Sequence, residues 1–227
     1  MAYAGPLVNG SVDHGAPPSR AAAPRWLGVL VLLAVGLHAL TKADDSKLAE
    51  MLWACHVATT LIGLGLLAGA PRVVAVGFLF HAAIGCPAYL LDLIVSRTTT
   101  PTSVLVHALP LAFGGLSVRR SGLPPRATLI AWGGYLALQP VSYVLTDPTL
   151  NVNLAHAVWE PIAGLVPGIW TSRLINATMA LTFLVTAAAI VRFWSRRRRA
   201  DVGSSAARAL PGRDGAAHVP AKGGMAR

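Results

Sequence analysis

The stretch VVAVGFLFHAAIGCPAYLLDLIV, residues 73–95, decides the fold class of this chain. It interrupts its apolar side chains with one histidine, His81, and one carboxylate, Asp92. A helix needs ~20 mostly apolar residues to cross the hydrocarbon core of a bilayer. The stretch therefore predicts a transmembrane helix that carries two ionisable groups.

Similar apolar runs occur along the rest of the chain, which is 54% hydrophobic and 12% charged. A soluble domain has about 25% charged residues, so the composition indicates an integral membrane protein. We expect an all-α polytopic fold with six transmembrane helices in an antiparallel bundle, because most connecting loops are short. Besides residues 73–95, the predicted helices cover residues 26–40, 48–70, 102–118, 127–145 and 174–193.

Three segments differ from these helices. Residues 146–173 are too long for a tight turn, and we expect an interfacial or re-entrant helix there, between helices 5 and 6. Residues 1–24 are predicted to be a disordered cytoplasmic tail, and residues 195–227 a basic, disordered cytoplasmic tail. The transmembrane domain is then residues 25–194.

The distribution of basic residues predicts the orientation. An even number of helices places both termini on one side, and cytoplasmic loops carry the excess of lysine and arginine. The loops on the other side hold Lys42, Lys47, Arg97 and Arg173, whereas the terminal side holds a larger set: Arg20, Arg25, Arg72, Arg119, Arg120, Arg126, Arg192 and Arg196 to Arg199. We expect a multi-pass protein of a bacterial-type plasma (inner) membrane with both termini cytoplasmic. The charge of +10 then indicates attraction to membrane lipids rather than to nucleic acid.

Histidines and acidic residues gather near the outer ends of the predicted helices. At about 1.5 Å of rise per residue, His56 lies ~12 Å, His107 ~8 Å and Asp92 ~5 Å from the outer surface. His38 lies near the same end, and His156 and Glu160 lie in the outer loop. A central charge in a bilayer costs roughly 2.5–3.5 kcal/mol, so this gathering predicts a polar cavity that opens outward.

The leading functional hypothesis is a metal-dependent membrane enzyme that acts on a lipid or another membrane-embedded substrate. Neutral imidazole is the commonest metal ligand in proteins, and His56, His107 and His156 are the predicted ligands of zinc or iron. Asp92 and Glu160 are the predicted catalytic residues: one completes the metal shell and the other acts as general base for a metal-bound water.

Two other functions remain open. Paired histidines such as His56 and His107 could be the axial ligands of haem b in an electron carrier. Alternatively, the chain could be a proton-coupled transporter of a small solute or metal ion, with His81, Gln139 and His38 as proton-relay or substrate contacts. A homo-oligomer or a partner in a membrane complex is compatible with any of these functions.

Overall fold

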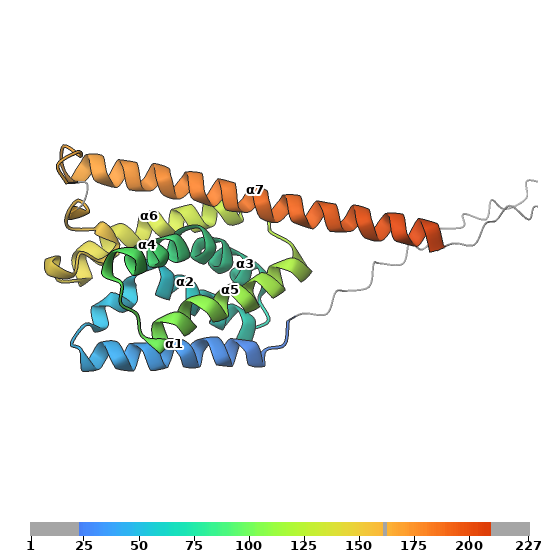
Figure 1. Ribbon diagram of the computed structural model, residues 1–227, viewed down its shortest axis with the longest axis horizontal. Helices are drawn as coiled ribbons and strands as arrows, with labels where there is room; N and C mark the ends of the chain where they lie inside the picture. Colours follow the sequence, from blue (N-terminus) through green and yellow to red (C-terminus); the bar gives the residue numbers. More distant parts are fainter. Residues whose placement is uncertain (1–22, 161–162, 210–227) are drawn as a thin grey trace, which may run out of the picture.

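The computed structural model describes residues 23–160 and 163–209, with side chains to Arg197. Within these residues the secondary structure is helical and no strand occurs, which confirms the predicted all-α class. The described residues contain seven α-helices in sequence (Figure 1): α1 (Trp26–Asp44), α2 (Ala54–Leu67), α3 (Pro71–Phe80), α4 (Cys86–Ser96), α5 (Pro101–Ser121), α6 (Ala127–Leu145) and α7 (Ile169–Ala209).

Four helices are long and apolar enough to cross a membrane: Trp26–Asp44, Pro71–Ser96, Pro101–Ser121 and Ile169–Arg197. The second of these is α3 and α4 together, and the last is most of α7. The other two helices are weaker candidates. α2 has 14 residues, about 21 Å at 1.5 Å per residue. α6 has the predicted bounds, and Gln139 and Pro140 interrupt its apolar sequence.

The short α2 corrects the predicted helix over residues 48–70. Leu48–Leu52 forms a separate 3-10 helix, η1, and Trp53 is extended at φ −55° and ψ 141°. α2 begins only at Ala54. The side chain of its N-cap residue, Trp53, forms no capping hydrogen bond with the first turn.

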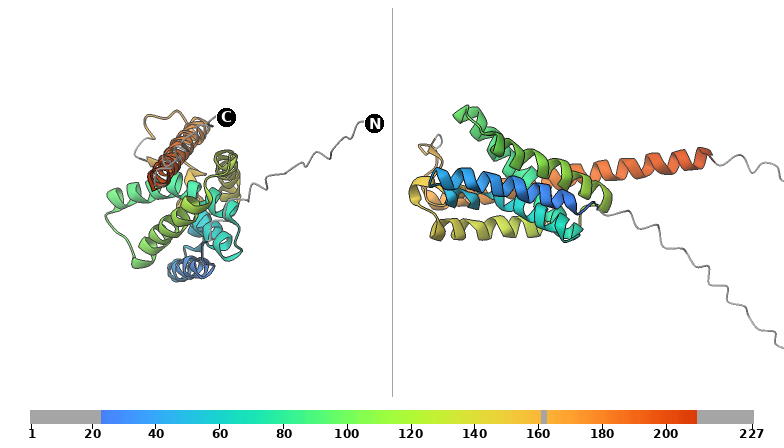
Figure 2. Two further views of the ribbon diagram at one scale, coloured as in Figure 1. Left: turned by 90° about the vertical axis from the view of Figure 1, so that its right-hand side faces the viewer. Right: turned by 90° about the horizontal axis from the view of Figure 1, so that it is seen from below.

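Glycines allow the first helices to approach one another closely. A Cβ atom on Gly28 of α1 would lie 2.5 Å from the main-chain nitrogen of Leu67 and 2.6 Å from the oxygen of Gly63, both on α2. A Cβ atom on Gly77 of α3 would lie 3.1 Å from the oxygen of Ala58. Small residues at crossings are the usual means by which membrane helices pack. The left-hand view of Figure 2, which looks along the helices, shows α1 (blue) next to the cyan helices that follow it in sequence.

The segment between α6 and α7 contradicts the predicted interfacial helix in its described part. It forms two 3-10 turns, η3 (Pro148–Leu150) and η4 (Val152–Leu154). Asn151, Asn153 and Leu154 have φ values of 42°, 55° and 57°. This left-handed backbone cannot continue a right-handed helix. His156 and Glu160 consequently do not lie together on one helix.

The ends of the chain also differ from expectation. α7 continues past residue 194 to Ala209, and Figure 1 shows it extending beyond the other helices. The first part of the predicted C-terminal tail is therefore helical. Residues 1–22 and 210–227, which make up most of the two predicted disordered tails, lie outside the described residues.

Candidate functional site

A π-helical turn joins α3 to α4. This turn, η2, covers His81–Gly85, and the N–H of Cys86 donates to the oxygen of His81, five residues earlier. Pro87 lacks the N–H that would bond Ala83 in a regular α-helix, which gives a physical reason for the irregularity here. Isolated π turns inside α-helices occur frequently at functional sites.

The π turn brings His81 into a group of four buried imidazole rings. The ring centroids are 4.8 Å apart for His38 and His56, 6.2 Å for His56 and His107, and 5.5 Å for His107 and His81. The residues belong to α1, α2, α5 and η2. Their exposed fractions are 3% for His38, 5% for His56, 6% for His107 and 0% for His81. We call these four residues the histidine cluster.

Two rings of the cluster are oriented by main-chain oxygens. The Nδ1 of His56 lies 3.0 Å from the oxygen of Glu50, and the Nδ1 of His107 lies 2.7 Å from the oxygen of Ser103. A carbonyl oxygen can only accept, so each neutral ring carries its proton on Nδ1 and has a free lone pair on Nε2. The Nε2 of His107 is buried and has no hydrogen-bond partner. It is thus an available acceptor inside the protein.

The other two rings are held by side-chain hydroxyls and main-chain atoms. His38 Nδ1 lies 3.0 Å from the Oγ1 of Thr102. His81 Nε2 lies 3.2 Å from the oxygen of His107, and His81 Nδ1 lies 3.3 Å from the Oγ1 of Thr59 and from the oxygen of Cys55. With two carbonyl oxygens and one hydroxyl around it, His81 can hold a proton on either nitrogen.

Tyr89 is a member of the site that sequence reasoning missed. Its ring stacks on His107, with centroids 3.8 Å apart and an interplanar angle of 11°. A regular helix predicts that Ala88 and Asp92 share the face of His81. The π turn inserts one extra residue, about 100° of rotation, so Ala88 and Asp92 are exposed instead. Pro87, two residues after Gly85, was the available signal in the sequence.

His156 lies in a different group, in the segment that follows α6. Its ring stacks on Tyr143 with centroids 4.9 Å apart, and its Nε2 lies 3.3 Å from the Oγ1 of Thr146. The guanidinium of Arg173 covers Tyr143 at 5.2 Å and Trp170 at 4.8 Å. The predicted ligands therefore divide: His56 and His107 are neighbours, and His156 packs among other side chains.

Among the described residues, the remaining predicted site residues form no hydrogen bond with the cluster. Gln139 donates to the oxygen of Asn153 at 2.9 Å, so it contacts the segment after α6. Glu160 is exposed, as is Asp92. Among the side chains that the structure describes, no group of three or more His, Cys, Asp or Glu could hold a metal ion. Cys55 and Cys86 are both free.

A hydrogen bond joins α2 to α5 beside His56 and His107. The hydroxyl of Thr59 donates to the oxygen of Val106 at 2.9 Å, and Tyr89 covers one face of His107. Haem b between these two histidines stays a prediction.

Comparison of the chain with protein-family models, with curated proteins and with solved structures gives no match. The histidine cluster is therefore the feature of this chain from which a function can be inferred.

Proposed function

We propose that this chain is a six-pass protein of the plasma (inner) membrane, with both termini cytoplasmic, whose histidine cluster relays protons in a proton-coupled transporter. The six spans are the four long apolar helices together with α2, extended outward by η1, and α6. One observation carries the functional proposal: four buried imidazoles from four separate elements form an uninterrupted series of neighbouring rings.

The series has the chemistry that a relay requires. An imidazole can take a proton on one nitrogen and release it from the other. Proton transfer needs donor and acceptor within hydrogen-bond reach or separated by one water. The ring centroids lie 4.8 to 6.2 Å apart and no direct hydrogen bond joins two rings among the described residues, so the proposed relay requires bridging water or a rotation of the rings. The free Nε2 of His107 can accept a proton from His56 once His56 has itself been protonated on Nε2. Histidine chains within transmembrane segments are typical of pumps and transporters.

The outer end of the series is close to charged groups. His38 lies near the outer end of α1, where Lys42 forms an ion pair with Glu50. The main-chain oxygen of Glu50 orients His56. We infer that protons enter from the outer surface at His38 and reach His81, which is fully buried, as the innermost member of the series.

A metal-dependent enzyme is the second candidate, and one observation favours it. Metal-binding histidines usually donate their other ring N–H to a carbonyl or carboxylate, and His56 and His107 are oriented in this way. His38 is the nearest third imidazole. The enzyme ranks second because both predicted catalytic carboxylates, Asp92 and Glu160, are exposed and form no hydrogen bond with the described residues of the cluster.

Solid-supported-membrane electrophysiology on liposomes that contain the full chain would test the relay. The solutes to screen are amino acids, organic acids and divalent cations, each with and without a pH gradient. We expect a proton-coupled current with at least one class of solute, lost in His107→Ala and in His56→Ala. The matched control is His156→Ala, which removes an imidazole outside the cluster and should keep the current. No current with any solute, or an undiminished current in His107→Ala, contradicts the proposal.

Elemental analysis of the same preparations separates the two candidates. The relay predicts no stoichiometric metal, and dialysis against EDTA should leave the current unchanged. A stoichiometric metal that is lost in both His56→Ala and His107→Ala would support the enzyme and overturn the relay.

A further inference from the structure

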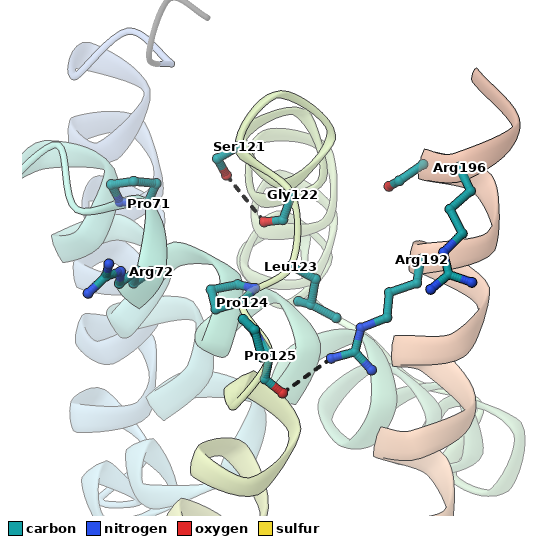
Figure 3. Close-up of a pocket in the computed structure, with 10 residues that line it drawn as sticks. Pro71, Arg72, Ser121, Gly122, Leu123, Pro124, Pro125, Arg192 and Arg196 are labelled. Atoms are coloured by element: carbon teal, nitrogen blue, oxygen red, sulfur yellow. Dashed lines mark hydrogen bonds between the residues drawn. The ribbon is translucent and has the colours of Figure 1, made fainter. Parts of the chain in front are cut away.

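A cavity at the opposite end of the molecule has no part in the histidine cluster. It lies where α3 begins, beside the connection between α5 and α6 and against α7 (Figure 3), and has a volume of about 490 Å³. We propose that it binds the phosphate of an anionic lipid headgroup. This proposal depends on the six-pass membrane placement given above and is independent of the proton relay.

Three arginines line the cavity from two sides. Arg72 lies on α3, and Arg192 and Arg196 lie one turn apart on α7, across the cavity (Figure 3). The hydroxyls of Ser121 and Ser195 also line it. Guanidinium groups bind phosphate through paired N–H donors, whereas the hydroxyls of Ser121 and Ser195 already donate to main-chain oxygens of their own helices. The lining therefore suits a phosphate rather than a neutral or cationic ligand.

Among the described side chains, no neighbouring carboxylate neutralises the positive charge of the cavity. The acidic side chains that the structure describes lie at the outer ends of the helices: Asp44, Asp45, Glu50, Asp92, Asp147 and Glu160. The salt bridge found among the described side chains joins Lys42 to Glu50 at that end. A phosphate can thus satisfy the arginines without displacing an existing ion pair.

The connection between α5 and α6 gives the cavity a constrained wall. Gly122 has φ +82°, a conformation that disfavours other residues, and Pro124 and Pro125 follow with fixed φ angles. The oxygen of Pro125 accepts a hydrogen bond from Arg192 at 3.3 Å, drawn as a dashed line in Figure 3. This bond orients the guanidinium and leaves its other N–H groups available.

A lipid is the source of phosphate that the position favours. The elements that form the cavity expose apolar side chains next to it in sequence, among them Val73, Leu129 and Ile190. Acyl chains can lie along these residues while the headgroup occupies the cavity. Anionic lipids also concentrate where arginines flank transmembrane helices.

Native mass spectrometry of the full chain in detergent, titrated with phosphatidylglycerol or phosphatidylcholine, tests the proposal. We expect selective retention of phosphatidylglycerol. Each charge-assisted hydrogen bond contributes about 1.5–3 kcal/mol, so removing one arginine should weaken binding by at least about tenfold. The test variant is R72Q/R192Q/R196Q. The conservative variant Arg192→Lys keeps the charge but lacks the paired N–H donors of a guanidinium, and it should weaken phosphatidylglycerol binding less than the triple variant does.

The matched control is R119Q/R120Q/R126Q, which removes the same charge from the same end of the molecule without altering the lining. If phosphatidylglycerol binding is retained in this control and lost in R72Q/R192Q/R196Q, the result supports a defined site. Equal losses in both triple variants indicate general charge attraction and overturn it.

A further arm adds excess inorganic phosphate. Displacement of the lipid by inorganic phosphate, with no preference for phosphatidylglycerol over phosphatidylcholine, would show a site for free phosphate and overturn the lipid assignment. The proton-coupled current of R72Q/R192Q/R196Q should remain, because the arginines are remote from the histidine cluster. The two proposals can therefore fail separately.

Discussion

The side-chain oxygen of Asn153 accepts a hydrogen bond from the main-chain N–H of Ala54 at 2.9 Å, across 99 residues of sequence. The side-chain nitrogen of Asn153 donates to the oxygen of Leu52 and to the hydroxyl of Ser142, both at 2.8 Å. The segment after α6 thus caps the first turn of α2 in the manner of an N-cap residue. His56 is in that turn, so its position depends on this remote asparagine.

Replacing Asn153 by alanine should destabilise the protein by about 1–3 kcal/mol, because buried polar groups on three elements lose their partner. Alanine would also occupy a left-handed backbone that asparagine tolerates better. Thermal unfolding in detergent measures the loss. The control Thr178→Ala removes an exposed hydroxyl bonded within α7 and should change stability by less than about 0.5 kcal/mol. Equal shifts for the two variants would contradict the capping role.

Two glycines on α1 should respond differently to the same substitution. Gly28→Ala places a Cβ atom against the backbone of α2, and overpacking of this kind costs about 1–3 kcal/mol. A Cβ atom on Gly36 meets nothing within 4 Å, so Gly36→Ala should be neutral or stabilising by up to about 1 kcal/mol. Thermal unfolding of both variants measures the difference in stability. Equal melting temperatures would contradict the close contact between Gly28 and the backbone of α2.

The hydrogen bonds of His56 and His107 predict the proton positions on their rings. Both should be Nδ1–H tautomers with an unprotonated Nε2, because their Nδ1 atoms face carbonyl oxygens. Solid-state ¹⁵N NMR of histidine-labelled protein in bilayers distinguishes the tautomers by the shifts of the two ring nitrogens. The spectra of His56→Ala and His107→Ala assign the signals. Protonated Nε2 atoms in either ring would show that the described orientation is incorrect.

Asp147 supplies a prediction on pH dependence outside the helices. The hydroxyl and the N–H of Thr149 both donate to its carboxylate and lower the pKa of Asp147 below its ordinary value of 3.8. A carboxylate with a lowered folded-state pKa stabilises the fold above its unfolded pKa, and this contribution is lost as pH falls through the folded pKa. Thr149→Val should raise the pKa of Asp147 in a ¹³C NMR titration of the carboxyl carbon. An unchanged titration midpoint argues against the hydroxyl bond.

Part of the site was predictable from residues close in sequence. The bounds of α6, residues 127–145, match the predicted helix because Pro124 and Pro125 precede it and Pro148 follows it. The proximity of His56 to His107 was also expected from their similar depths. By contrast, the depth count assumed a continuous helix from residue 48, whereas α2 begins at Ala54.

The neighbours of each imidazole could not be predicted in this way. The π turn at His81 rotates every later residue of α4, which brings Tyr89 to His107 and turns Asp92 outward. The left-handed backbone at Asn151, Asn153 and Leu154 prevents the helix predicted for this segment, so His156 and Glu160 do not lie on one helix.

The membrane class and the helical content followed from composition and from the lengths of apolar runs, which are local properties of the chain. Which histidines meet depended on long-range packing: where α2 starts, how η2 shifts the helical phase, and where Asn153 docks. A displacement of one residue rotates a side chain on a helix by about 100°, so small non-local effects determine which rings come into contact.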